Sequence, residues 1–192
     1  MQGPHDAAAA LDRTSIRLAD ARDAAALAEV AAVTFPLACP PTTTKEASDA
    51  FVAAHLAESS FRAYLADPDR VLVVADPGDG ARLDGYTMLV LGESTDPDVQ
   101  AAVRLRPTCE LSKCYVRADA HGRGVAAALL ARTRDEAVAH GAAGMWLGTN
   151  IANARAIRFY EKHGFVKVGH KRFRLGDGYE EDFVLECALT GA

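Results

Sequence analysis

The chain has 192 residues, 49% of them hydrophobic and 24% charged, a composition typical of one well-packed globular domain. Its formal charge of −5 argues against a broad nucleic-acid-binding surface, because such surfaces need clustered lysines and arginines. No apolar run is long enough to cross a bilayer and the first residues do not resemble a secretory signal, so we expect a cytoplasmic protein.

The chain divides into a short tail and one domain. Residues 1–13 are rich in alanine and carry no strand or helix signal, which predicts a flexible tail before a single domain at 14–190. The four cysteines form no C-x-x-C pair, so we expect reduced thiols and no metal site. They are Cys39, Cys109, Cys114 and Cys187.

The first half of the sequence predicts a strand, two helical stretches and a hairpin. A strand at 15–18 precedes a helix that Asp20 can cap and that the prolines at 36, 40 and 41 should end. A second helical stretch covers 45–66, with an interruption near 58–60. Apolar runs at 71–75 and 86–91 flank strong turn residues and predict a hairpin.

The second half predicts two strand–helix units and a final hairpin. After a connection with some helical character at 96–106, a strand at 110–116 leads to a helix at 123–140 that Gly141 ends. A strand at 145–149 and a helix at 152–163 follow, then paired strands at 165–173 and 179–189. This order predicts an α/β (α+β) fold with a mixed, mostly antiparallel sheet, helices on both faces, and 110–116 parallel to 145–149.

The turn at 121–126, which reads His-Gly-Arg-Gly-Val-Ala, is a candidate phosphate site. Glycine lets the main chain approach a ligand closely, and the N–H groups at the start of the following helix are free to bind an anion. Glycine-rich turns also occur without ligands. The spacing does not match the dinucleotide fingerprint, and no Walker lysine follows.

The helix at 152–163 carries a second pattern. Asn153, Ala156 and Tyr160 are three and seven residues apart, which places them on one helical face. A small residue between two polar ones allows another group to pack closely. A helical tyrosine can also be a plain core residue, and that alternative stays open here.

Together the two segments resemble the GNAT superfamily of N-acetyltransferases. The turn fits the pyrophosphate-loop pattern Gln/Arg-x-x-Gly-x-Gly/Ala, with His121 in the first position in place of Gln or Arg. The second family pattern, Asn-x-x-Ala-x-x-Phe/Leu-Tyr-x-x-x-Gly-Phe, is matched in full. Its residues here are Asn153, Ala156, Phe159, Tyr160, Gly164 and Phe165.

The resemblance implies a cleft for acetyl-CoA and no metal. The strands at 110–116 and 145–149 should splay apart around the pantetheine arm, and the pyrophosphate should lie on the amides of the glycine turn. The implied cofactor-binding residues are Cys114, Tyr115, Val116, His121, Gly122, Arg123, Gly124, Val125, Ala126, Ala127, Asn150, Asn153 and Tyr160.

The chemistry implied is attack of an amine on the thioester carbonyl. A main-chain N–H of Tyr115 or Val116 would stabilise the oxyanion, and Tyr160, with an ordinary pKa of about 10, would protonate the leaving thiolate. Glu110 is the candidate base through a water molecule, with Glu181 and Asp182 as alternatives and a solvated carboxylate as the non-catalytic interpretation.

Three further stretches, at 35–41, 110–116 and 173–182, look like the bacterial branch of the superfamily that acetylates spermidine and spermine. An acidic rim could match such polycations, although a solvated hairpin tip explains it equally. A protein N-terminus or lysine as acceptor, and a non-catalytic acyl-CoA-binding regulator, stay open. A homodimer is the default assembly. The rim residues are Asp177, Glu180, Glu181 and Asp182.

Overall fold

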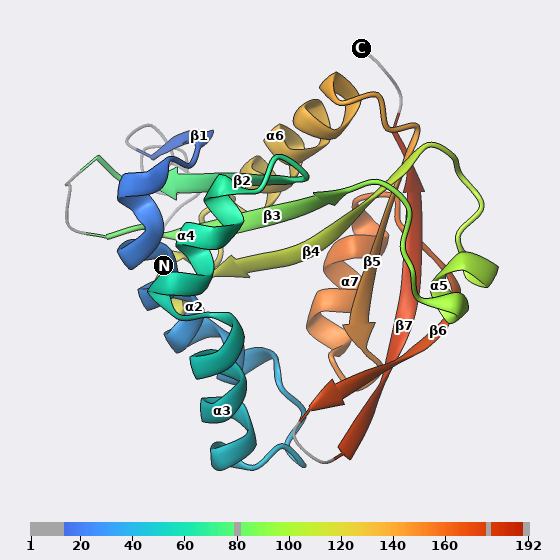
Figure 1. Ribbon diagram of the computed structural model, residues 1–192, viewed down its shortest axis with the longest axis horizontal. Coiled ribbons are helices and arrows are strands. Elements are labelled where there is room, and N and C mark those ends of the chain that lie inside the picture. The colour runs from blue at the N-terminus through green and yellow to red at the C-terminus, as the bar shows by residue number, and fades with distance from the viewer. Residues whose placement is uncertain (1–13, 79–81, 176–177, 190–192) are drawn as a thin grey trace, which may run out of the picture.

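The computed structural model describes residues 14–78, 82–175 and 178–189, and the predicted tail at 1–13 lies outside the described residues. The strands form one seven-stranded sheet with the order β1-β2-β3-β4-β5-β7-β6 (Figure 1). Every neighbouring pair is antiparallel except β4 and β5, which are parallel. The predicted fold class is confirmed. The strands are β1 Ser15–Leu18, β2 Arg70–Asp76, β3 Gly85–Leu91, β4 Thr108–Val116, β5 Gly144–Asn150, β6 Val166–Leu175 and β7 Gly178–Ala188.

Helices cover both faces of the sheet, and β2 shows how. Leu72 and Val74 pack into the cluster that contains α2, whereas Val73 and Ala75 pack against α6. This alternation is the two-residue period of a strand buried on both faces. None of the described helices is long and apolar enough to cross a membrane. The helices are η1 Ala21–Asp23, α2 Ala24–Ala38, α3 Lys45–His55, α4 Glu58–Ala66, α5 Pro97–Ala102, η2 Ala118–Ala120, α6 Val125–Ala139 and α7 Ala154–Lys162.

The predicted break before Pro40 and Pro41 is confirmed, but Pro36 does not end the helix. The helix that Asp20 introduces continues through Pro36 to Ala38. Proline removes one main-chain donor, which leaves the carbonyl of Ala32 without its helical partner. Pro36 and Ala32 are both exposed, so water can satisfy that carbonyl. The extra turn carries Leu37 and Ala38 to the edge of the site described below.

The break in the second helical stretch lies slightly earlier than predicted. The helix α3 ends at His55 and α4 begins at Glu58, so the interruption falls at Leu56 and Ala57 instead of near 58–60. Leu56 is fully buried, and its N–H bonds the carbonyl of Val52. The two short helices can therefore bury their apolar sides separately against α2 and β2.

The parallel pair diverges after a short contact. Pairing between β4 and β5 covers only Thr108–Glu110 with Gly144–Trp146, while β4 continues beside β3 as far as Val116. The strand β5 continues beside β7 to Asn150. Figure 1 shows β4 and β5 separating toward their C-terminal ends, with α7 beside the opening. A gap therefore forms in the middle of the sheet.

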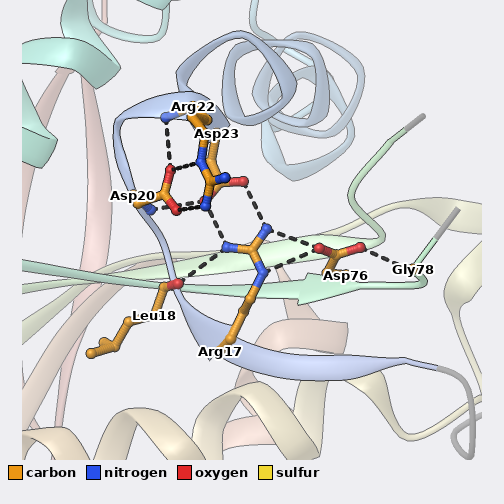
Figure 2. A network of polar contacts seen from close by, with 7 residues as sticks. All are labelled: Arg17, Leu18, Asp20, Arg22, Asp23, Asp76 and Gly78. Atoms are coloured by element: carbon orange, nitrogen blue, oxygen red, sulfur yellow. Dashed lines mark hydrogen bonds and ion pairs between the residues drawn. The ribbon is translucent and has the colours of Figure 1, made fainter. Parts of the chain in front are cut away.

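An ion-pair network fixes α2 relative to this sheet (Figure 2). The guanidinium of Arg17 on β1 bonds Asp23 with two contacts of 2.8 Å, and Asp76 on β2 at 2.9 and 3.1 Å. Asp23 also accepts from the N–H of Asp20 at 2.8 Å, which completes a capping box. The start of α2 is thus tied to two strands.

Candidate active site

Two cavities meet in the gap between β4 and β5. The first cavity, about 180 Å³, extends from the end of β4 to His121 and Ala126 at the start of α6. The second cavity, about 250 Å³, lies on the side of the sheet that carries α2 and α3. Six residues line both, so the cavities join there. They are Ala38, Cys114, Tyr115, Asn153, Ala156 and Tyr160.

The glycine turn leads into α6 through two left-handed residues. Gly122 has φ +78° and Gly124, the N-cap, has φ +80°. A Cβ added to Gly122 would meet no atom of the described chain within 4 Å, so the backbone conformation itself demands glycine. No side chain caps α6, and the described residues offer no acceptor to the N–H groups of Val125 and Ala126. These donors are available to an anion.

His121, Arg123 and Val125 contribute differently from one another. The Nε2–H of His121 donates to the carbonyl of Val116 at 2.8 Å, which joins the turn to the end of β4. Arg123 forms an ion pair at 3.3 Å with Asp84, whose side chain is 1% exposed. The side chain of Val125 is buried in the core. Val125 can therefore meet a ligand only through its main chain.

Tyr160 lies at the junction of the two cavities. Its phenol lies close enough to the thiol of Cys114 on β4 for each group to shift the pKa of the other. Burial raises the pKa of Tyr160 well above its usual range, and burial also raises the pKa of Cys114 to about 11. The expectation of an ordinary tyrosine pKa was therefore wrong, because the ring is almost fully desolvated.

Asn150 and Asn153 both line the site, and the side-chain oxygen of each accepts a hydrogen bond from a nearby main-chain N–H. The Oδ1 of Asn153 accepts from the N–H of Ala156 at 3.1 Å and caps α7. The Oδ1 of Asn150 accepts from the N–H of Ala152 at 2.9 Å and borders the second cavity. Each side chain keeps its NH₂ group for a ligand.

Two carboxyl groups in the second cavity have raised pKa values. Burial raises the pKa of Glu110, and the positive charges of Lys171 and Lys113 oppose that shift. Burial raises the pKa of Asp182 to about 6, with Lys171 again opposing. Glu181 is exposed and lines neither cavity, so of the two alternative bases only Asp182 is in place.

The predicted acidic rim is only partly present at the site. Asp182 and Glu180 line the second cavity and Glu181 does not, while Asp177 lies outside the described residues. Of the predicted cofactor residues, Gly122, Arg123, Gly124, Val125 and Ala127 line neither cavity and lie at the N-terminus of α6.

Several lining residues were missed from the sequence. Thr34, Leu37 and Ala38 reach the first cavity from α2, and Phe51 reaches the second from α3. No motif marks them, because their position depends on how α2 and α3 pack on the sheet. Lys113 and Lys171 also line the second cavity. Their position on strands beside predicted site residues was the only available signal.

Comparison with known proteins gives consistent results. Residues 40–165 match the model of the acetyltransferase (GNAT) family. Uncharacterized N-acetyltransferases of Mycobacterium bovis and Mycobacterium tuberculosis are 44% identical over 168 residues, which is 88% of this chain and 99% of theirs.

Solved structures share the fold at low identity. The PaiA N-acetyltransferase of Thermoplasma acidophilum, in complex with coenzyme A, aligns with a TM-score of 0.70 at 17% identity, over 91% of this chain and 98% of that one. The YncA putative acetyltransferase of Salmonella typhimurium, with its cofactor acetyl-CoA, gives 0.60 at 20%, over 93% and 95%. The ribosomal-protein-S18-alanine N-acetyltransferase of Escherichia coli gives 0.61 at 18%, over 93% and 96%.

Proposed function

Because the chain belongs to the GNAT family of N-acetyltransferases, we propose that it binds acetyl-CoA in the first cavity and transfers the acetyl group directly to a primary amine in the second. The observation that supports this arrangement is the junction of the two cavities at Tyr160 and Cys114. A donor bound in the first cavity and an acceptor bound in the second would meet there.

The residues of the first cavity fit a diphosphate followed by an extended arm. The free N–H groups at the start of α6 and the positive end of its helix dipole suit the diphosphate. Beyond Glu110, β4 has no partner strand on its β5 side, so the main chain of Cys114, Tyr115 and Val116 can bond the arm. When bound, acetyl-CoA supplies an activated thioester carbonyl. We assign oxyanion stabilisation to the N–H of Tyr115 or Val116.

Tyr160 is the proposed acid. Its raised pKa keeps the phenol protonated at neutral pH, which is the form that can donate a proton to a leaving thiolate. A thiolate formed in the same buried position would also be poorly solvated, as the raised pKa of Cys114 indicates. The desolvation that makes Tyr160 a weaker acid thus also makes the thiolate a stronger base.

Glu110 is the proposed base, with Asp182 as the alternative. An alkylammonium with a pKa of about 10.4 is neutral in only about one molecule in a thousand at neutral pH, so the acceptor must lose a proton at the site. Burial raises the affinity of both carboxylates for that proton. Glu110 lies on the same strand, five residues before Tyr115, the first of the proposed oxyanion donors, and reaches the amine through water.

For the acceptor, two candidate classes have support. A polyamine such as spermidine suits the three carboxylates that line the second cavity, Glu110, Glu180 and Asp182. A protein N-terminus or lysine is the second candidate, since the Escherichia coli structural neighbour is named as acting on a ribosomal protein. The cytoplasmic location and the homodimer stay predictions.

The deciding experiment is a thiol-release assay with acetyl-CoA and a panel of amines, namely spermidine, spermine, amino acids, aminoglycosides and short peptides. We expect release that depends on both acetyl-CoA and one class of amine. If none of the amines gives thiol release while calorimetry still records coenzyme A binding, the result would instead support the acyl-CoA-binding regulator. Absence of coenzyme A binding would contradict both.

A further inference from the structure

Lys113 places a partly buried ammonium group in the second cavity without an ion pair. Its Nζ lies 5.6 Å from the centre of the Tyr64 ring. Among the described residues, no carboxylate lies within 4.0 Å of this Nζ and no hydrogen bond reaches it. Charges withdrawn from water are normally paired, because their desolvation is unfavourable and an aromatic face offsets only part of that cost. Burial accordingly lowers the pKa of Lys113 to about 8.

The surroundings of Lys113 add positive charge. Arg70 lies 4.8 Å from the centre of the same Tyr64 ring and is already paired with Asp67 at 3.0 Å. Its charge further lowers the pKa of Lys113, while the negative charge of Glu110 opposes the shift more strongly than Arg70 adds to it. Two cations and one carboxylate therefore lie near one another at this end of the cavity.

The opposite wall has the reverse character. Asp182 and Glu180 line it from β7, and Lys171 faces Asp182 from the neighbouring strand β6. Both Lys171 and Asp182 lie over Gly148 of β5, where an added Cβ would come within 3.3 and 3.2 Å of them. Lys171 thus interacts with both Asp182 and Glu110, whereas Lys113 interacts with Glu110. With Arg70 beside Lys113 and two carboxylates on β7, the β4 wall carries more positive charge than the β7 wall.

We infer that the acceptor is an amino carboxylate, a molecule that carries a carboxylate as well as its primary amine, and that Lys113 binds the carboxylate. The inference rests on the proposed function and ranks amino carboxylates above polyamines. A polyamine would bring a second ammonium group toward Lys113 and Arg70, where like charges repel. An amino carboxylate complements both walls, and its carboxylate supplies the partner that Lys113 lacks.

The test compares matched acceptors that differ only in charge. Amino carboxylates of increasing chain length and their carboxamides are assayed by thiol release, with spermidine in parallel. We expect kcat/KM for the best carboxylate to exceed that of its amide and of spermidine by about tenfold or more. Because the carboxylate does not react, the preference should lie mainly in KM.

Variants then assign the preference to Lys113. Lys113→Met should reduce the carboxylate-over-amide ratio about tenfold, and Lys113→Arg, which keeps the charge, should retain most of it. Replacing a buried unpaired charge by methionine is not expected to unfold the chain. Lys162→Met, at an exposed lysine outside both cavities, is the control and should leave the ratio unchanged.

Three results would overturn the inference while leaving the N-acetyltransferase proposal intact. These are equal rates for acids and amides, a preference for spermidine, or a carboxylate preference that persists in Lys113→Met. No release with any amine would remove the proposed function, and the inference with it.

Discussion

Tyr160 on α7 and Cys114 on β4 both line the junction where the two cavities meet, close enough for the phenol and the thiol to shift each other's pKa. A sulfur atom is therefore a near neighbour of this phenol within the described chain. In the proposed reaction the phenol gives its proton to another sulfur, that of the leaving thiol.

Replacing Tyr160 by phenylalanine removes the proton donor and keeps the ring. We expect kcat for acetyl transfer to fall by roughly 10²–10⁴-fold, because the thiolate must then leave unprotonated. Coenzyme A affinity should change little. Thiol release and calorimetry measure the two quantities. Tyr179→Phe, at an exposed tyrosine, is the matched control. An unchanged kcat in Tyr160→Phe would contradict the assignment.

The role of Gly122 in coenzyme A binding can be tested by comparing its alanine variant with that of Gly92, a left-handed glycine outside the turn. Alanine at Gly122 or at Gly92, with φ of +78° and +89°, meets no atom of the described chain, so each should cost about 1–2 kcal/mol of stability through the backbone alone. Only Gly122→Ala should also weaken coenzyme A binding, by tenfold or more, because it displaces the N–H groups that start α6. Equal affinities in the two variants would argue against the phosphate site.

The pH dependence of kcat/KM should show an acidic limb. A carboxylate that accepts the ammonium proton must be ionised, and Asp182, with its pKa raised to about 6, is only about one-tenth ionised at pH 5. If Asp182 is the base, Asp182→Asn removes activity, whereas Glu110→Gln retains activity with the same acidic limb in its pH profile. If Glu110 is the base, Glu110→Gln removes activity and Asp182→Asn retains it. Full activity in both single variants would exclude a carboxylate base at either position.

Asp182 should also reduce stability at neutral pH. Its folded pKa of about 6 exceeds the ordinary 3.8, so the folded state binds the proton more tightly. The stability from this proton is complete below pH 3.8 and is lost as pH rises through 6. Asp182→Asn should therefore raise the free energy of unfolding at pH 8 by roughly 1–3 kcal/mol. Urea titrations at pH 8 and pH 4 should show the gain only at pH 8, and Glu181→Gln should show none.

The network of Figure 2 should contribute to stability and not to chemistry. Arg17→Met leaves the buried Asp23 without its cation, which should lower the free energy of unfolding by about 1–3 kcal/mol. The free energy of unfolding should also fall less steeply in this variant as the pH is lowered, because Arg17 helps to lower the pKa of Asp76. Arg22→Met, at an exposed ion pair, should have no measurable effect on thermal unfolding. A Tm equal to that of wild type in Arg17→Met would contradict this role.

Much of the fold could be predicted because its signals are local. The alternating or continuous apolar runs of the strands, the cap at Asp20 and the glycines that end α6 and α7 act over a few residues. The continuation of α2 through Pro36 could not be predicted. The exposure of Pro36 and Ala32 decides whether water replaces the missing hydrogen bond, and exposure depends on the packing of the whole helix.

The residues of the candidate site likewise fall into those that local sequence patterns predicted and those that depend on tertiary structure. His121, Gly124, Asn153 and Tyr160 could be named because each acts through the local geometry of a turn or helix. The distinction between Asp182 and Glu181 could not be made, since it depends on which side chain of a strand faces the cavity. Lys113 went unnoticed, because a strand lysine is unusual only once it is seen to be largely withdrawn from water without an ion pair.

The sequence by itself determined the order of elements, the glycine turn before α6 and the residues that share one face of α7, because hydrogen bonding and side-chain period act between near neighbours. Only the tertiary structure decided that β4 and β5 part after Glu110, that two cavities meet at Tyr160, and which titratable groups lose their water. Desolvation and charge pairing join residues far apart in the chain, so no local pattern encodes them.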